Sequence, residues 1–226
     1  MANEPLAVEI ASRLRRSILV GRLKPGDSVK ERDNAAELGV SRTPMREAIR
    51  VLAKEGLIEL RPSRSPIVAN PSLREVIDDI DVIRALEVLS GELACRNASV
   101  EEIEAIAELQ HRLDGAPPDA DPLDLFEIDM EIHRAIARAS HNPSLAETHG
   151  AYLARLWRVR YLSARQVGGK DRTYRQHREI IAGLRARDAA EVARVVASHI
   201  DHIILNVRGY FDSSPRCDGD RPAVRG

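Results

Sequence analysis

The sequence holds few aromatic and few sulfur-bearing side chains, and both shortages narrow the class of protein. Its 226 residues include two Cys, one Trp, four Tyr and two Phe. Cys95 and Cys217 share no metal-ligand spacing and suggest no disulfide framework, which fits a reducing compartment. No apolar run approaches the ~20 residues that cross a bilayer, and the first residues lack the apolar segment of a signal peptide. These absences predict a soluble, cytoplasmic protein with no membrane partner.

The residues that are abundant favour helices around an aliphatic core. Hydrophobic residues make up 43% of the chain and aromatic residues only 3%, so the core must consist mainly of Leu, Ile, Val and Ala. A chain rich in Ala, Leu, Ile, Glu and Arg and poor in Gly is typical of helical proteins. Its length allows one medium domain or two small ones.

The charge is unevenly distributed along the chain. The whole protein has a net charge of −1, with 34 basic and 35 acidic residues. Residues 1–70 contain 13 Lys and Arg against 9 Asp and Glu, a net charge of +4, which leaves 21 basic and 26 acidic residues, or −5, for the rest. The N-terminal part is therefore the one expected to meet a polyanion.

The first part of the chain combines three helical patterns with two short apolar runs. The helices are expected at 5–20, 31–38 and 42–55, and the runs at 57–60 and 67–69. A Pro/Ser/Arg segment between the two runs is typical of a hairpin tip. Residues 1–70 are therefore predicted to form a domain of three helices and a small β-hairpin.

The stretch "GVSRTPMREAI" carries the most specific pattern of this domain. Gly39 suits the left-handed end of one helix, and Ser41 can cap the next. Met45 begins an inward apolar stripe, while Arg42 and Arg46 fall roughly 100° away around the helix. On spacing alone a solvated basic face is the commoner explanation. The glycine turn, the preceding short helix and the following hairpin together favour a helix-turn-helix, whose recognition helix meets DNA bases with its N-terminal part.

The rest of the chain is helical in pattern to about residue 211. Helices are expected at 73–97, 99–113, 122–140, 144–165, 172–187 and 189–210. Residues 71–211 are predicted to form an all-helical antiparallel bundle, and residues 212–226 a disordered tail.

Four residues of the bundle form a candidate metal site. Asp129 and His133 are four apart and share a helix face, and His177 and His199 lie on the apolar stripes of two later helices. The first pair alone is more often an intrahelical ion pair than a metal site. Inward histidines need partners, however, and three of them with a carboxylate could bind a divalent metal such as Zn, Ni, Fe or Mn.

The N-terminal segment "ELGVSRTPMREAIRVLAKEGLIEL" resembles the winged helix-turn-helix of the GntR family of bacterial transcription regulators. The resemblance implies three DNA-contacting arginines, Arg32, Arg42 and Arg46, with Ser41 and Thr43 as phosphate contacts.

Two positions of this domain depart from the family pattern. Asn34 stands where the family usually has a leucine, and Ser65 stands where the hairpin tip usually carries a glycine. The resemblance then implies either a weaker DNA contact of the hairpin or one carried by Arg64.

The C-terminal part resembles the effector domain of the FadR-like subgroup of the same family. The landmarks are "VIRALEVLSGELA", "DMEIHRAIARASHN" and "HREIIAGLRARDAAEVARVVASHI". The resemblance implies a divalent metal bound by Asp129, His133, His177 and His199, with an organic-acid effector beside it. Arg84 could clamp the effector carboxylate, or could equally form a surface ion pair. Asn142 is a further effector-binding candidate, and it follows His141 where the family more often has glycine.

These patterns predict a homodimeric transcription regulator, and more specifically a repressor, that binds a pseudo-palindromic double-stranded operator. A small carboxylate effector would control this binding. One alternative is a regulator that senses the metal itself. A metalloenzyme is the weaker alternative, because the sequence has no HExxH, nucleophile elbow or phosphate loop and an enzyme gives no reason for the basic N-terminal part. The protein is therefore not expected to be an enzyme.

Overall fold

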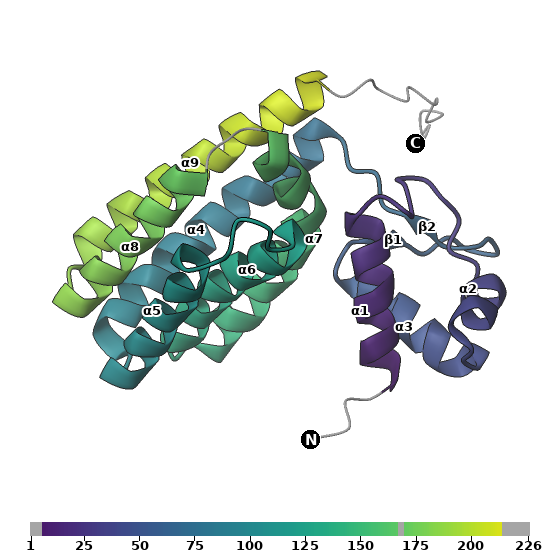
Figure 1. The fold of residues 1–226 in the computed structure, drawn as a ribbon, viewed down its shortest axis with the longest axis horizontal. Helices are drawn as coiled ribbons and strands as arrows, with labels where there is room; N and C mark the ends of the chain where they lie inside the picture. Colours follow the sequence, from purple (N-terminus) through teal and green to yellow (C-terminus); the bar gives the residue numbers. More distant parts are fainter. Residues whose placement is uncertain (1–5, 167–169, 214–226) are drawn as a thin grey trace.

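The computed structural model describes residues 6–166 and 170–213, which form an N-terminal unit joined to a helical bundle (Figure 1). The N-terminal unit contains α1 (Leu6–Leu19), α2 (Glu31–Leu38), α3 (Arg42–Lys54), β1 (Ile58–Glu59) and β2 (Ile67–Val68). The bundle contains α4 (Leu73–Asn97), α5 (Val100–Asp114), α6 (Pro122–Ala139), α7 (Pro143–Gln166), α8 (Lys170–Ala186) and α9 (Ala189–Ser213). The predicted fold class, a winged helix-turn-helix followed by an all-helical bundle, is confirmed.

The N-terminal unit is held by one aliphatic core. Its members come from all three helices and both strands, and include Ile10, Ile18, Met45, Leu52 and Val68. The strands pair antiparallel, with Ile58 opposite Val68. A single bridge from Ser28 to Ile67 adds the segment before α2 to this sheet.

Local backbone chemistry sets the turn between α2 and α3. Gly39 ends α2 with φ at 67°, the left-handed conformation that glycine adopts without steric cost. Pro44 lies in the first turn of α3, where its missing N–H loses no helical bond. The prediction that Ser41 caps α3 is half right. Ser41 occupies the cap position, but its side chain makes no capping hydrogen bond.

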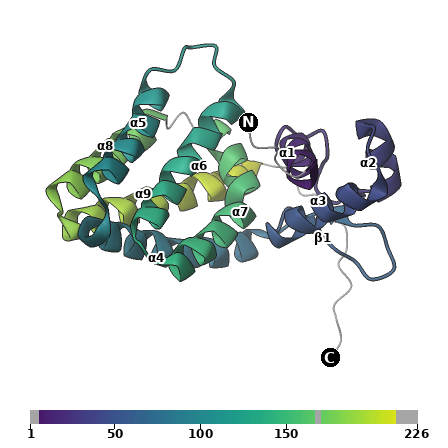
Figure 2. The same cartoon turned by 90° about the horizontal axis from the view of Figure 1, so that it is seen from below.

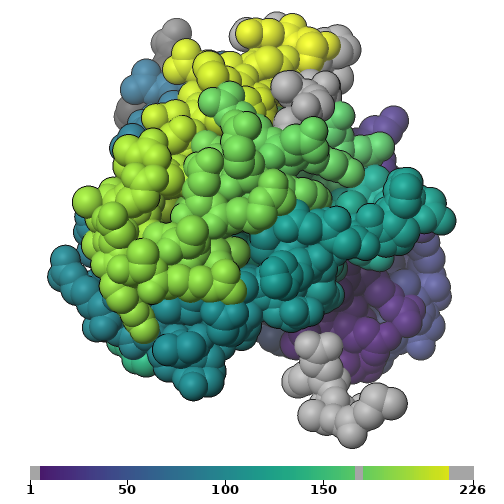
Figure 3. All heavy atoms as spheres, turned by 60° about the vertical axis from the view of Figure 1, so that its left-hand side comes forward, coloured from purple at the N-terminus to yellow at the C-terminus, as the bar shows by residue number. Residues whose placement is uncertain are grey.

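The bundle is organised around α4, which packs against α6, α7, α8 and α9. Two capping boxes fix the starts of its first helices, Ser72 with Glu75 at α4 and Ser99 with Glu102 at α5. The outer face of the bundle, formed by α5, α6, α8 and α9, is shown in Figure 3.

Polar and apolar contacts dock the N-terminal unit on the bundle, and Leu19 at the end of α1 is buried in the same hydrophobic cluster as Trp157. Arg16 of α1 pairs with Asp121 and with Asp124 at 3.0 Å. The guanidinium of Arg15 lies 6.0 Å from the centroid of the Trp157 ring on α7. In both Figure 1 and Figure 2, α2 lies on the side of the N-terminal unit away from the bundle, so docking leaves that side open.

The link between the two parts is short. Only residues 69–72 separate β2 from α4. Within the described residues, no helix is both long and apolar enough to cross a bilayer. The predicted tail lies, from residue 214 onward, outside the described residues, and α9 continues to Ser213.

Close packing of α9 against its neighbours generates a stability prediction. Gly91 of α4 and Gly183 of α8 both face Val192 of α9, and a methyl group at either glycine would lie 2.6 Å from a Val192 methyl. We expect Gly91→Ala to lower the free energy of unfolding by about 1–3 kcal/mol, because the added methyl overpacks the core.

The matched control is Gly209→Ala, since nothing lies within 4 Å of a methyl placed there. That variant should be as stable as the wild type or more stable by up to ~1 kcal/mol, because alanine favours helix. Urea unfolding followed by circular dichroism measures both, and equal stability of the two variants would contradict the packing argument.

Candidate functional site

The first candidate site is the exposed face of α3. Its apolar stripe, Met45, Ala48, Ile49 and Leu52, is buried in the N-terminal core. Arg42 and Arg46 lie outside that core, with side chains 65% and 49% exposed. Ser41 and Thr43 are also exposed. The start of α3 therefore presents two guanidinium groups and two hydroxyl groups to the surroundings.

An acidic residue of α2 holds these arginines. Glu31 accepts two hydrogen bonds from Arg46, from Nε and Nη2, each at 3.0 Å. Nη2 of Arg42 lies 3.6 Å from the same carboxylate. The hydrogen bond from Arg46 is the main reason why the pKa of Glu31 falls below its ordinary value. Arg32, the third predicted contact, is 84% exposed and pairs with Asp33.

Local hydrogen bonds form at Asn34 and Ser65, the two positions that depart from the family pattern. The side-chain amide of Asn34 donates to the carbonyl oxygen of Lys30 at 2.9 Å, which satisfies it at the start of α2. At the hairpin tip, Arg61 donates to the carbonyl oxygen of Ser65 from both Nε and Nη2, at 3.0 and 2.7 Å. Arg64 remains exposed at this tip.

The second candidate site is a cluster of histidines inside the bundle. His133 of α6, His177 of α8 and His199 of α9 each offer a ring nitrogen, and these atoms lie within 4.8 Å of one another. All three residues are buried, at 4%, 1% and 3% exposure. The three rings come from three different helices, so the bundle itself brings them together.

A second layer of side chains orients each ring through Nδ1. That atom of His133 lies 3.0 Å from Oε2 of Glu87. The same atom of His177 and of His199 lies 3.0 Å and 3.2 Å from a glutamine side-chain oxygen, of Gln110 and Gln176 respectively. Such partners fix the orientation and tautomer of metal-binding histidines. They leave Nε2 of His177 and of His199 as candidate ligands without a hydrogen-bond partner among the described residues, whereas Nε2 of His133 accepts a hydrogen bond from Arg160.

Asp129 lies at the edge of this cluster. Its Oδ1 is 3.5 Å from Nε2 of His177, and its side chain is 15% exposed. Oδ1 of Asp129 and Nε2 of His177 and of His199 are buried without a hydrogen-bond partner among the described residues. Asp129 lies outside the group of donor atoms that are within 4.8 Å of one another. Unpaired buried polar atoms are costly, and a metal ion bound by the histidines would give Nε2 of His177 and of His199 a partner.

Burial also sets the protonation state of two rings. It lowers the pKa of His177 to about 4 and that of His199 well below its ordinary value. Both imidazoles are therefore neutral at pH 7. Neutral imidazole is the form that binds a metal, and the chemistry of the donor set suits Zn, Ni, Fe or Mn.

Three charged or polar residues beside the cluster were not predicted from the sequence. Glu87, His149 and Arg160 are all buried. Nη2 of Arg160 donates to Nε2 of His133 at 3.1 Å, and Nη1 of Arg160 lies 3.5 Å from Oε1 of Glu87. Burial alone would raise the pKa of Glu87, but the charge and hydrogen bond of His133, with His149 and Arg160, hold it well below its ordinary value.

One of these residues left a signal in the sequence. Glu87 follows Ile80 and Ile83 at positions i+7 and i+4, so it lies on the apolar stripe of its helix, where a carboxylate requires a buried partner. Arg160 has no such signal, because "LWRVRYLSARQ" contains three arginines and only packing distinguishes them.

The two predicted effector contacts have other partners in this structure. Arg84 pairs with Asp201 at 3.2 Å, and its side chain is 41% exposed. Asn142 caps the start of α7 by accepting a hydrogen bond from the backbone N–H of Leu145 at 3.1 Å. Neither residue is grouped with the histidines here, and their role in effector binding stays a prediction.

Comparison with known proteins connects both parts of the chain to one kind of protein. Residues 6–68 match the model of the gntR family of bacterial regulatory proteins, and residues 78–202 match the FCD domain. The HTH-type transcriptional repressor RspR of Escherichia coli K12 is 28% identical over 206 residues, which cover 91% of this chain and 90% of RspR. A probable D-xylose utilization operon transcriptional repressor of Paenarthrobacter nicotinovorans is 28% identical over 84% of this chain and 85% of its own.

Solved structures share the whole fold. McbR/YncC of E. coli superposes with a TM-score of 0.79 at 20% identity, covering 93% of this chain and 100% of that one. A GntR regulator from Rhodococcus sp. RHA1 gives 0.72 at 20% identity, covering 90% and 97%. At this identity the likeness concerns the fold alone.

The histidine cluster generates a prediction about metal binding. We expect Zn²⁺ added to chelator-treated protein to raise its Tm by roughly 5–10 °C at a hundredfold excess over Kd, because the ion binds only the folded site. His199→Ala should remove this shift, as measured by differential scanning calorimetry.

His111→Ala provides the matched control. His111 is an exposed histidine of α5 that pairs with Glu108, away from the histidine cluster, so this variant should keep the wild-type shift. The metal assignment fails if none of Zn²⁺, Ni²⁺, Fe²⁺ and Mn²⁺ raises the Tm, or if His199→Ala responds like the wild type.

Proposed function

Since this chain belongs to the gntR family of bacterial regulatory proteins and is a DNA-binding transcriptional regulator, not an enzyme, we propose that it is a repressor controlled by a small organic acid. The acid would bind beside a divalent metal ion in the bundle, and its binding would change the affinity of the N-terminal unit for DNA. A regulator of this kind works in the cytoplasm, where the DNA is. The convergence of three buried histidine nitrogens is the observation that carries the proposed control.

The DNA-binding surface would be the exposed start of α3. A symmetric dimer would place two copies of α3 in successive major grooves of a pseudo-palindromic operator. Arg42 and Arg46 would contact bases or phosphates there, since arginine suits both. Contacts to the phosphate backbone of the DNA would come from Arg32, Ser41 and Thr43, and also from Arg64 in the hairpin.

The metal would be held by Asp129, His133, His177 and His199. The close approach of the three histidine nitrogens, the oriented Nδ1 atoms and the unpaired Nε2 atoms of His177 and His199 support this assignment. A bound ion supplies positive charge that attracts carboxylate oxygens. The protein would add a second positive charge in Arg160, which is buried and has no hydrogen-bond partner for its Nη1 among the described residues.

The helix α7 links that site to the N-terminal unit. Arg160 lies beside the histidines, and Trp157 and Arg155 of the same helix meet the N-terminal unit. The side chain of Arg155 packs against Gly56, so closely that a methyl group on Gly56 would lie 2.7 Å from its Cγ. Gly56 lies two residues beyond Lys54, the last residue of α3. A shift of α7 that accompanies effector binding would therefore reach the DNA-binding helix.

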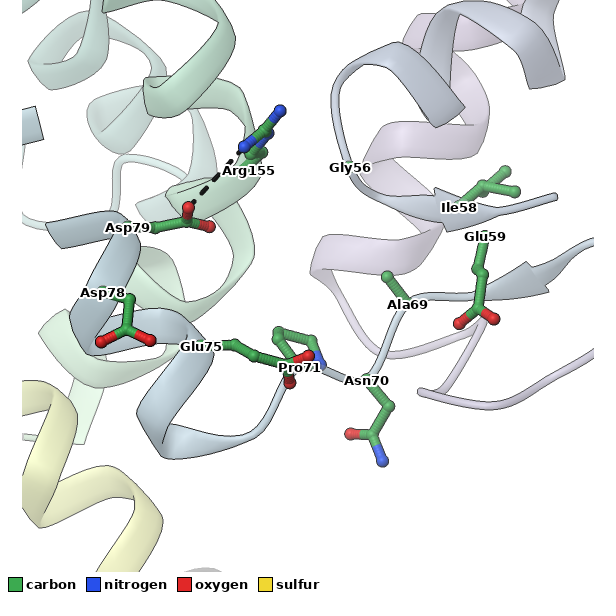
Figure 4. Close-up of a pocket in the computed structure, with 10 residues that line it drawn as sticks. All are labelled: Gly56, Ile58, Glu59, Ala69, Asn70, Pro71, Glu75, Asp78, Asp79 and Arg155. Carbon is green, nitrogen blue, oxygen red and sulfur yellow. Dashed lines mark ion pairs between the residues drawn. The ribbon is translucent and has the colours of Figure 1, made fainter. Parts of the chain in front are cut away.

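A cavity of about 460 Å³ leaves room for such a movement. It lies between the hairpin and the start of α4, and its lining includes Gly56, Asn70, Asp78, Asp79 and Arg155 (Figure 4). Figure 4 also shows Arg155 of α7 reaching Asp79 of α4, at 3.7 Å, on the bundle side of this cavity. An effector changes the DNA affinity only if it binds the two arrangements of the domains unequally.

A regulator that senses the metal alone is the alternative, because the same four ligands would serve it. Operator binding across a range of free metal concentrations, without organic acid, separates the two. A full response to metal alone favours the sensor, whereas a response that requires the acid favours the proposed control.

The DNA-binding assignment predicts the effect of Arg46→Ala. An operator duplex is first selected from a random-sequence pool with the wild-type protein. Arg46→Ala should weaken binding to it by about 1–3 kcal/mol and relax specificity at one position, because a bidentate contact to guanine is lost. Fluorescence anisotropy at moderate salt measures this loss.

Arg194→Ala is the control for that experiment. It removes the same charge from an exposed arginine of α9 that pairs with Glu191, outside the N-terminal unit, and should leave operator affinity unchanged. Unchanged affinity of Arg46→Ala as well would remove Arg46 from the DNA-binding surface.

The control site predicts a separate variant phenotype. Arg160→Lys should retain the charge and bind the operator normally, but should respond less to any acid that releases the wild type. Lysine cannot form the planar bidentate contact that arginine makes with a carboxylate. The measurement is operator release across a panel of small mono-, di- and tricarboxylates with Zn²⁺ present.

Arg165→Lys, a change on an exposed arginine further along α7, is the matched control and should respond as the wild type does. An Arg160→Lys response that equals the wild-type response for every acid in the panel that releases the wild type would show that Arg160 does not bind the effector.

A further inference from the structure

We infer that Glu31 is a specificity-determining residue of the DNA-binding surface. Its carboxylate fixes the pose of Arg46 and offsets the charge of Arg42 and Arg46, so that the surface discriminates more strongly between its operator and other DNA. This inference rests on the proposed contact of α3 with DNA. Glu31 itself would not need to touch a base.

The hydrogen bonds between Glu31 and Arg46 leave the Nη1 and Nη2 end of the Arg46 guanidinium open to a base. Glu31 accepts from Nε and Nη2, which form one side of the guanidinium. A guanidinium has five N–H donors, so Nη1 and the second hydrogen on Nη2 stay available at its tip. That tip has the fork geometry that matches O6 and N7 of guanine. Arg46 can thus be held from the side by Glu31 and meet a base with its end.

Glu31 is well placed to hold a long side chain still. It is the first residue of α2, where the helix dipole favours a carboxylate. Its side chain is only 23% exposed, whereas that of Arg46 is 49% exposed. A free arginine side chain carries substantial rotamer entropy, part of which a preorganised one has already lost before DNA binds.

The second effect concerns charge. The basic residues around α3 have acidic neighbours: Arg32 pairs with Asp33, Arg50 with Glu47, and both Arg42 and Arg46 with Glu31. Phosphate attraction is independent of sequence and grows with each neutralising cation. A surface whose cations are already paired therefore gains less from non-specific DNA. Among these acids Glu31 alone contacts both arginines at the start of α3.

The test compares Glu31→Gln with Asp33→Asn. Each variant removes one negative charge from the first turn of α2, but Asp33 touches Arg32 and Lys30 rather than Arg46. Affinities are measured by fluorescence anisotropy for a random-sequence duplex and for the operator duplex selected with the wild type, over a range of salt concentrations.

We expect both variants to bind the random duplex a few-fold more tightly, with a steeper salt dependence, because each frees a cation for phosphate. Only Glu31→Gln should also lower the ratio of operator to random affinity beyond this charge effect, by about tenfold, since Arg46 loses its fixed pose. In a protein that already carries Arg46→Ala, this extra loss should disappear. Glu31→Gln should then change the ratio of operator to random affinity no more than Asp33→Asn does.

Two outcomes overturn the inference: an unchanged ratio in Glu31→Gln, or an equal loss of the ratio in Asp33→Asn. If Arg46→Ala leaves operator affinity unchanged, the proposed DNA contact fails first and Glu31 with it. If Arg46→Ala weakens operator binding while Glu31→Gln keeps the wild-type ratio, only the role of Glu31 fails.

Glu31→Asp keeps the charge with a shorter reach, so it should bind random DNA as the wild type does while losing operator affinity. Circular dichroism melting of each variant confirms that it folds.

Discussion

The need to satisfy polar groups inside an aliphatic bundle is the constraint on which most of this structure depends. Few aromatic residues and many Leu, Ile, Val and Ala make an interior that offers almost no hydrogen bonds, yet four histidines are buried within it, three of them in one cluster. Glu87, Gln110 and Gln176 each partner one Nδ1 of the clustered histidines, so each of these three rings is held in one orientation. Nε2 of His177 and of His199 is left without a hydrogen-bond partner among the described residues, and these atoms give the bundle a site at which a metal ion would bind.

The same residues make α7 a connecting element. Arg160 reaches the histidines, while Arg155 and Trp157, less than two turns away, meet the N-terminal unit. The interface between the two parts also includes Leu19 of α1, which is 1% exposed and packs in the same hydrophobic cluster as Trp157. Exposed ion pairs such as Arg16 with Asp124 add little to its stability.

Local patterns predicted most of the fold. Every expected helix is present, with ends within three residues of the expected ones, because turn signals and aliphatic periodicity are strong in this chain. The inward histidines followed from the same periodicity. Arg160 could not be predicted, since its burial depends on how α7 packs against α4 and α6. Nor could the pairing of Glu31 with Arg46, which joins residues fifteen positions apart across the turn between α2 and α3. Ser41 shows the reverse: a favourable cap residue at the correct position, without the bond that the pattern implies.

The brevity of the link between β2 and α4 has a geometric consequence. Four residues reach at most about 14 Å when fully extended. Each DNA-binding unit of a dimer could therefore swing about its tether, but could not travel far from its own bundle. The distance between half-sites that such a dimer can bridge would then be set by the separation of the two bundles, to within a narrow tolerance. An operator with correct half-sites at the wrong spacing would then bind weakly, because the two DNA-binding units could not contact both half-sites at once.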